Sequence, residues 1–347
     1  MCKYQNDAAA CYDRIIPQHA MICSRKFNVP KKVCKLAATT LHKTKYHVQT
    51  AVRTSPNYYS STKEMPLYGS GQGSGNAGTE WLFIEESMIS TIVRLCEGCT
   101  MSSPDKSIKW KKIITAFVDD LRKYSNDWEN NNQQVTLKKL KVSAQEWEHL
   151  LYMSGGKLEL DKCALYIIQW IFDDDGIAKL KNKSNEKLII KSSQTGKEHE
   201  IKLLDNDEYF QYLGITSSPN GDQSKELQQL IQKAHEGARV FQSSPFTRYL
   251  SHIYLNTHLQ PKLFYPLTSS SLNTEDCRQV EKVYINHAIS NMGYSSKWPL
   301  ALRYGSHNYG GLEIKNLATT ALIKKVHGLQ NLLYKTESAN AVHLLIA

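Results

Sequence analysis

Apolar and polar positions follow two different patterns along the chain. Up to about residue 220, short alternating or continuous apolar runs are interleaved with segments whose apolar residues recur every three or four positions, so strands and helices alternate. From Asp222 onward the three-to-four-residue spacing dominates, which predicts helices. The pattern therefore predicts an α+β region, residues 1–220, followed by a mostly helical region, residues 221–347.

Individual elements follow from the same patterns. Residues 106–118 fit one strand or two strands joined by a turn, and residues 162–180 predict a β-hairpin around the acidic triplet at 173–175. Further strands are predicted at residues 45–53 and 208–218. Helices are predicted at residues 14–27, 29–44, 79–95, 134–155, 225–241, 246–259 and 274–289.

Charge and composition narrow the class of protein. The 347 residues are 41% apolar and 22% charged, which is enough for one large domain or two ordinary ones with a sizeable core. The net charge of +10 favours a polyanionic partner, most simply nucleic acid, although charge that only aids solubility would give a similar excess. No apolar run has the length of a membrane span and the N-terminus lacks a signal-peptide pattern, so we expect a nuclear or cytoplasmic protein without a membrane partner.

The eight cysteines are scattered, which predicts reduced thiols in an intracellular protein. Cys96 and Cys99 form a CxxC pair, for which two interpretations stay open. They are either half of a zinc site, whose second ligand pair has no clear spacing here, or two ordinary half-buried thiols.

Two acidic segments are candidates for metal chemistry. Asp119 and Asp120 follow the apolar end of a predicted strand in FVDD, where they form either a polar turn or a divalent-metal site with hard oxygen ligands. Asp7 and Asp13 flank Tyr12 in NDAAACYDRI. Phosphoryl transfer with two metal ions needs carboxylates from separate chain segments, and these two segments supply them.

With these residues the chain resembles reverse transcriptases of retrotransposons, closest to the non-LTR, LINE-like group. NDAAACYDRI is similar to the first palm motif of that family, and FVDD is similar to its aromatic-x-Asp-Asp motif. The resemblance implies that Asp7, Asp119 and Asp120 hold two Mg²⁺ ions, with Mn²⁺ as an alternative. It also implies that Tyr12 is the steric gate against a ribose 2′-hydroxyl, whereas Asp13 supports the structure.

A glycine-rich segment at 68–78, YGSGQGSGNAG, resembles the second motif of the family. In that motif a Gln-Gly turn opens a helix beneath the nucleotide and the template, so Gln72 and Gly73 are the implied substrate-binding residues. Ala77 and Gly78 stand where the family usually has Ser-Pro, which is a departure from the pattern. Glycines still allow the backbone to approach a ligand closely, and a helix N-terminus favours phosphate.

Three later segments follow in the order of the family. SGGKLELDKC resembles the fourth motif, in which Lys162 would be the general acid that protonates the leaving pyrophosphate. YLGI resembles the primer grip, formed by Tyr212, Leu213 and Gly214. YGGLEIKNL is similar to a Gly-Gly-Leu segment that follows the thumb in LINE-like elements.

The resemblance covers nearly the whole chain and implies a fold and an activity. The fold is a polymerase palm, an antiparallel sheet backed by helices, followed by a helical thumb. The activity is RNA-directed DNA polymerisation, with dNTPs, an RNA template and a DNA primer as partners. Because only MCKYQN precedes Asp7, we expect the fingers to be largely absent, the strand that carries Asp7 to be exposed and poorly paired, and other domains of the element to act in trans or be missing.

Two other functions stay open. A catalytically silent remnant could still bind nucleic acid, and the absent fingers favour it, whereas the intact carboxylates favour the polymerase. A metal-dependent nuclease could use the same carboxylates, but it leaves Gln72, Gly73 and Lys162 unexplained. Several basic residues of the helical region are predicted phosphate contacts: Lys225, Lys233, Arg239, Arg248 and Lys262.

Overall fold

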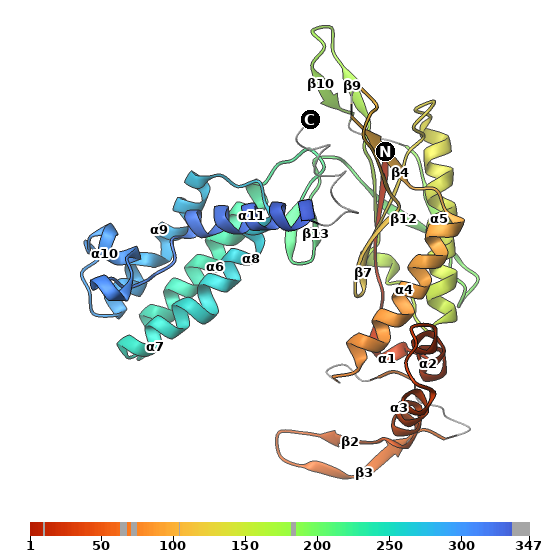
Figure 1. Cartoon of the computed structure of the whole chain (residues 1–347), viewed down its shortest axis with the longest axis horizontal. Coiled ribbons are helices and arrows are strands. Elements are labelled where there is room, and N and C mark those ends of the chain that lie inside the picture. The colour runs from red at the N-terminus through yellow and green to blue at the C-terminus, as the bar shows by residue number, and fades with distance from the viewer. Residues whose placement is uncertain (10, 63–67, 71–74, 104, 182–184, 335–347) are drawn as a thin grey trace. The chain divides into compact units, whose positions relative to one another are not determined.

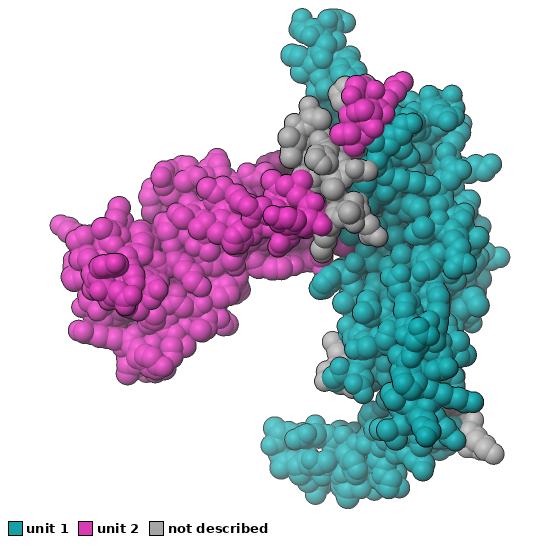
Figure 2. All heavy atoms as spheres, viewed as in Figure 1, with its two compact units in different colours: residues 1–101, 109–206 teal, residues 102–108, 207–347 magenta. Residues whose placement is uncertain are grey.

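The structure is a computed structural model with two compact units. The first unit comprises residues 1–101 and 109–206, and the second comprises residues 102–108 and 207–347 (Figure 2). The first unit combines a sheet with helices and the second consists mainly of helices, so the predicted α+β class is confirmed. The structure describes residues 1–9, 11–62, 68–70, 75–103, 105–181 and 185–334.

A six-stranded sheet forms the centre of the first unit. Its strands are β1 (Cys2–Asp7), β6 (Ile114–Phe117), β7 (Asp120–Ser125), β8 (Ala164–Ile167), β11 (Leu188–Lys191) and β12 (Glu198–Leu204). Their order is β11–β12–β8–β1–β7–β6. Neighbouring strands are antiparallel except β8 and β12, which run parallel, so the predicted antiparallel character of the sheet is interrupted at one pair. A long connection between β8 and β12 makes the parallel pairing possible.

The expectation that the strand carrying Asp7 is exposed and poorly paired is wrong. β1 lies between β7 and β8 and pairs with both over most of its length. Cys2 and Tyr4 on one face of β1 are fully buried. The strand looks short and polar in the sequence because its pairing partners lie far along the chain and leave no local signal.

Two long helices pack on one side of this sheet, α4 (Ala77–Leu95) and α5 (Gln133–Met153) (Figure 1). Both helices are predicted from the sequence and both are confirmed. Leu140 and Trp147 of α5 are buried against the sheet, which places the apolar stripe of the helix toward the core. Asn132 caps α5, because its side-chain oxygen accepts hydrogen bonds from two backbone N–H groups of the first turn.

The predicted hairpin around the acidic triplet is formed by β9 (Trp170–Phe172) and β10 (Ala178–Leu180). Asp173 in the connection forms an ion pair with Lys179 at 2.8 Å. The apolar run before β9 does not extend the hairpin, because it forms β8 of the central sheet.

The remaining elements of the first unit lie between β1 and β6 in the chain. The predicted strand at 45–53 is shorter than expected, because it ends at Gln49 and the following residues turn into a second, unpredicted strand of the same hairpin. The predicted segment at 106–118 forms two strands, β5 and β6. These elements are α1 (Cys11–Arg14), α2 (Pro17–Lys26), α3 (Lys31–Lys43), β2 (Lys45–Gln49), β3 (Thr54–Ser60), β4 (Cys99–Ser102) and β5 (Lys109–Lys112).

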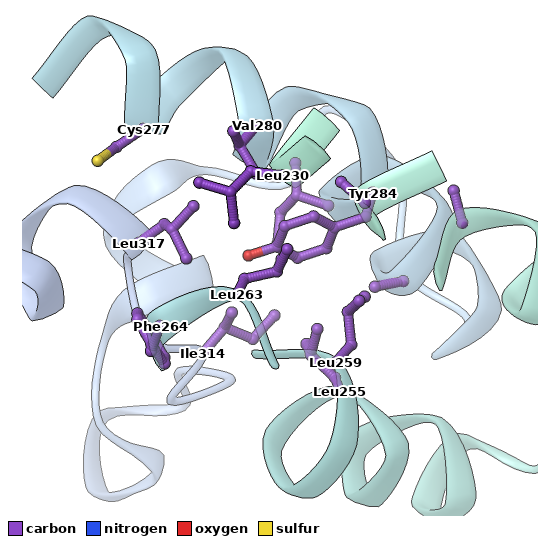
Figure 3. Packing of buried hydrophobic residues seen from close by; sticks show 14 of the residues in the cluster. Leu230, Leu255, Leu259, Leu263, Phe264, Cys277, Val280, Tyr284, Ile314 and Leu317 are labelled. Carbon is purple, nitrogen blue, oxygen red and sulfur yellow. The ribbon is translucent and has the colours of Figure 1, made fainter. Parts of the chain in front are cut away.

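The second unit begins with a hairpin and continues as helices around one apolar core. Figure 3 shows part of that core, in which Leu230, Leu263, Tyr284 and Leu317 are fully buried. The helices predicted in this region are confirmed, and a π-helical segment, Tyr254–Leu259, joins α7 to α8. No described helix is long and apolar enough to cross a membrane. The elements are β13 (Phe210–Tyr212), β14 (Ile215–Ser217), α6 (Ser224–Ser243), α7 (Arg248–Ile253), α8 (Gln260–Ser269), α9 (Thr274–Asn291), α10 (Leu300–Tyr304) and α11 (Leu317–Tyr334).

Candidate active site

The three candidate metal-binding aspartates meet at one end of the central sheet. Asp7 is the last residue of β1 and Asp120 is the first residue of β7, and the two lie directly opposite each other across the antiparallel pair. Asp119 occupies the turn between β6 and β7, and its backbone carbonyl accepts a hydrogen bond of 3.2 Å from the N–H of Ala8. Carboxylates from two distant segments of the chain are therefore neighbours.

The turn that carries Asp119 has an unusual backbone. Phe117 pairs with Asp120, so Val118 and Asp119 form a two-residue connection between the strands. Val118 has a φ of 57°, a conformation that tight hairpins require but that glycine usually supplies and a β-branched residue rarely adopts. The indole N–H of Trp81 on α4 donates a 2.7 Å hydrogen bond to the carbonyl of Val118. Backbone strain of this kind is typical of functional sites, where the surrounding structure holds it in place.

Lys162 lies beside Asp7. Its Nζ atom is 2.9 Å from Oδ2 of Asp7. The segment that carries Lys162 runs along the start of the chain, because the N–H of Glu159 donates a 3.0 Å hydrogen bond to the carbonyl of Asp7. The same segment also passes close to α1 at Gly155, whose φ is 95° and where a Cβ would lie 2.2 Å from the carbonyl oxygen of Arg14.

Negative charge at this end of the sheet is only partly compensated. Burial raises the pKa of the Asp120 carboxyl, and the neighbouring Asp119 and Asp7 raise it further, while Arg122 and Lys162 act in the opposite direction. The hydrogen bond to Asp7 raises the pKa of the Lys162 ammonium, which therefore stays protonated at neutral pH. The site combines mutually repelling carboxylates with one charged lysine.

The glycine-rich loop begins alongside α1. The N–H of Ser70 donates a 2.9 Å hydrogen bond to the carbonyl of Tyr12. Gly69 has a φ of 97°, and a Cβ there would lie 2.6 Å from the carbonyl oxygen of Asp13, so only glycine fits this position. These contacts bring the start of the loop next to the first candidate motif.

Of the three candidate substrate-binding residues, the structure describes only Tyr12. Tyr12 is half-buried, and burial raises the pKa of its hydroxyl, with a smaller contribution from Asp119. Gln72 and Gly73 lie outside the described residues, so their placement stays a prediction.

The predicted primer grip belongs to the second unit. Leu213 and Gly214 form the two-residue turn between β13 and β14, with φ values of 50° and 74°, and Tyr212 is the last residue of β13. The hydroxyl of Tyr265 donates a 2.7 Å hydrogen bond to the carbonyl of Leu213. The role of this turn toward a primer stays a prediction.

Glu85 on α4 is a candidate site residue that the sequence patterns do not single out. Its side chain is 6% exposed, and its Oε1 atom has no hydrogen-bond partner among the described residues. Burial raises the pKa of this carboxyl to about 7, with contributions from Glu86 and Asp119. A glutamate on the apolar stripe of a helix, four residues after Trp81, is the signal that could have identified it.

Replacing Glu85 by glutamine is expected to raise the free energy of unfolding at pH 8 by about 1–3 kcal/mol. The folded state holds the proton of Glu85 more tightly than the unfolded state, so this group makes the wild type lose stability as the pH rises from 4.5 to about 7. Urea unfolding at pH 5 and pH 8 measures both effects. Glu198→Gln, at an exposed position of β12, is the matched control, and a Glu85→Gln variant that is less stable at pH 8 would contradict the argument.

No group of three or more His, Cys, Asp or Glu side chains in the described part of the chain is placed so that it could hold a metal ion. All eight cysteines are free and buried, including Cys96 and Cys99, and burial raises the pKa of the Cys99 thiol.

The molecule is thus an α+β protein with an aspartate cluster at the end of its central sheet. Its similarity to known proteins is weak. No protein-family model and no curated protein matches the chain. Among solved structures, telomerase from Candida tropicalis in complex with a TWJ fragment of telomeric RNA is similar at a TM-score of 0.31 and 11% identity, over 100% of this chain and 49% of that chain. Telomerase from Candida albicans in a complex of the same kind gives 0.26 and 10%, over 99% and 49%. The chain spans about half the length of both proteins, and similarity this weak assigns no family.

Proposed function

We propose that this protein is a template-directed nucleotidyltransferase, an RNA-directed DNA polymerase of a non-LTR retrotransposon. The observation that carries the proposal is the pairing of Asp7 with Asp120 across β1 and β7, with Asp119 in the adjoining strained turn. Neighbouring carboxylates repel one another, so a fold that gathers them at a strained turn is typical of a site that uses them. The order of the motifs along the chain supports the same chemistry.

Asp7, Asp119 and Asp120 would hold Mg²⁺, or Mn²⁺, because carboxylate oxygens are the ligands these ions prefer. When bound, two such ions supply a lowered pKa for the primer 3′-hydroxyl and neutralise charge on the triphosphate. The raised pKa of Asp120 fits this use, since a cation would relieve the repulsion that contributes to it. Metal binding would compete with the ion pair between Lys162 and Asp7.

The chain's own residues would divide the remaining work. Lys162 would protonate the leaving pyrophosphate, and its raised pKa keeps the required proton in place at neutral pH. Tyr12 would exclude a ribose 2′-hydroxyl from the nucleotide position. Gln72 and Gly73 would contact the nucleotide and the template, and the β13–β14 turn would hold the primer.

Replacing Lys162 by glutamine is expected to slow single-turnover primer extension by about 100-fold, because general acid catalysis typically contributes 10²–10⁴-fold. The matched control is Lys187→Gln, since Lys187 is also exposed and forms a 2.8 Å ion pair, with Glu200. We expect the control to extend at the wild-type rate. Equal rates for the wild type and Lys162→Gln would remove Lys162 from the proposed mechanism.

A second candidate is a catalytically silent protein that binds nucleic acid. The ion pair between Lys162 and Asp7 favours it, because it occupies one of the carboxylates that would hold a metal ion. Incubation of the chain with an RNA template, a DNA primer, dNTPs and Mg²⁺ separates the candidates. Extension supports the polymerase, binding that weakens with salt but gives no extension supports the silent protein, and cleavage of the primer or template supports a nuclease.

A further inference from the structure

Positive charge is unevenly distributed along the chain. The chain has 43 Lys and Arg against 33 Asp and Glu, but residues 14–62 contain nine of the former and none of the latter. The other residues are almost balanced, at 34 against 33, so nearly all of the net charge of +10 lies in this one segment. The segment runs from the end of α1 through α2, α3 and the β2–β3 hairpin.

These cations lie on the surface. Eight of the nine are exposed, and none of the nine forms an ion pair with an acidic side chain among the described residues. A cationic surface without acidic partners repels itself and attracts a polyanion. The eight exposed residues are Arg25, Lys26, Lys31, Lys32, Lys35, Lys43, Lys45 and Arg53.

Aromatic rings accompany the charge on the β2–β3 hairpin, which extends from the end of α3 (Figure 1). Lys45 Nζ lies 4.2 Å from the centre of the Tyr58 ring, which is a cation–π contact that orients both groups. Tyr46 and Tyr59 stack with their ring centres 5.2 Å apart. Tyr58 and Tyr59 are each about half exposed, at 50% and 52%. Half-exposed rings beside cations are typical of surfaces on which nucleic-acid bases stack.

A hollow of about 540 Å³ is lined mainly by α3, with Tyr46 of β2 and residues at the start of α4. Leu36 and Tyr46 are among its lining residues, and Glu80 is the acidic residue that borders it. Glu80 is buried and accepts a hydrogen bond from the hydroxyl of Ser70, so its charge is turned away from solvent. The mostly apolar lining of the hollow suits the face of a base better than a phosphate.

We propose that α2, α3 and the β2–β3 hairpin form a surface that binds single-stranded nucleic acid. The exposed cations contact the phosphates, and Tyr58 and Tyr59, which lie on opposite faces of the hairpin, each offer a ring on which an unpaired base can stack. The inference extends the nucleic-acid binding in the proposed function but needs none of the carboxylates, so it stands or falls separately from catalysis. A duplex or an anionic lipid surface would satisfy the cations equally well, but neither offers unpaired bases to the rings.

Fluorescence anisotropy of the full chain with labelled single-stranded RNA, single-stranded DNA and duplex DNA of about 20 nucleotides tests the proposal over a range of salt concentrations. One variant removes three cations of α3, Lys31→Gln, Lys32→Gln and Lys35→Gln. The control removes three exposed lysines elsewhere in the first unit and so has the same net charge: Lys138→Gln, Lys141→Gln and Lys197→Gln.

The α3 variant is expected to bind single strands about tenfold more weakly, with the slope of log K against log salt reduced by about 2, because each lost phosphate contact contributes about 0.7. The charge-matched control is expected to stay within about twofold of the wild type. A second variant, Tyr58→Ala with Tyr59→Ala, is expected to lose at least about fivefold toward single strands and nothing toward duplex.

Two results would overturn the proposal. Equal losses in the α3 variant and the charge-matched control would show that only net charge matters. Binding to duplex DNA, heparin or phosphatidylserine vesicles that is as tight as binding to single strands, and insensitive to the tyrosine variant, would show a general polyanion surface. The binding measurements are made with EDTA in place of Mg²⁺ and without dNTPs, so that they report binding separately from the proposed catalysis.

Discussion

Replacement of Asp119 and Asp120 by asparagine is expected to reduce primer extension at least about 1000-fold. The two substitutions remove carboxylates that would hold the metal ions. Metal-ion stabilisation of a phosphoryl-transfer transition state is worth several kcal/mol. The fold should survive, because the replacement relieves the repulsion that helps to raise the pKa of Asp120. Extension of a labelled DNA primer on an RNA template, measured under single-turnover conditions, gives the rate.

The chain offers a matched control for this experiment. Asp174 and Asp175 are also adjacent aspartates and are exposed in the connection between β9 and β10, so Asp174→Asn with Asp175→Asn makes the same change of charge. We expect the control to extend normally. Wild-type extension by the Asp119→Asn, Asp120→Asn variant would exclude these carboxylates from catalysis. A lower free energy of unfolding in that variant would instead assign them a structural role.

Lys123→Met is expected to raise the free energy of unfolding by about 2–4 kcal/mol at pH 7. Lys123 lies on β7 with its side chain fully buried against α5. Its Nζ donates hydrogen bonds to the carbonyl oxygen of Ser143 at 2.5 Å and to the hydroxyl of Ser143 at 3.1 Å, and it lies 5.3 Å from the centre of the Trp147 ring. No described acidic side chain forms an ion pair with it, so methionine replaces a buried charge by an apolar side chain of similar length.

The effect depends on pH in a defined direction. Burial lowers the pKa of Lys123 from 10.5 to about 7, so the unfolded chain binds more protons than the folded chain between these values. The destabilisation of the wild-type fold by Lys123 is therefore complete below pH 7. It is lost as the pH rises toward 10.5, by up to about 1.4 kcal/mol per pH unit. Burial and Arg122 also lower the pKa of Lys3 to about 7, so a smaller slope remains in the variant.

Urea unfolding of the wild type and Lys123→Met at pH 7 and pH 9.5 measures the stability difference and its pH dependence. Lys138→Met on the exposed side of α5 is the control and is expected to change stability by less than about 0.5 kcal/mol. A Lys123→Met variant with an unchanged pH slope, or one that unfolds at lower urea at pH 7, would contradict the argument from burial.

Long helices were the most predictable part of the fold. The apolar stripes of α4, α5, α6 and α9 repeat every three to four residues, so their existence follows from contacts within a few turns of the same helix. Strands were less predictable, because a strand depends on partners elsewhere in the chain. β1 looks exposed in the sequence, yet it is paired on both sides and buries Cys2 and Tyr4.

The residues with the most perturbed chemistry were also hard to predict. Lys123 stands at an alternate position of a strand, and only the packing of α5 over β7 shows that it is buried. Glu85 lies in a helix whose boundaries were predicted well, but its closeness to Asp119 depends on where α4 packs. In both cases the pKa is set by burial, which is a property of the assembled core.

Composition and short-range periodicity carry enough information to predict the α+β class, the main helices, the concentration of positive charge in residues 14–62 and the order of the candidate motifs. They do not show that Asp7 lies opposite Asp120, that Lys162 binds Asp7, or that Val118 holds the turn in a rare conformation, all of which depend on how the chain packs. Pairing between β1 and β7 joins segments far apart in the chain, and strand register is set by the packing of the whole sheet.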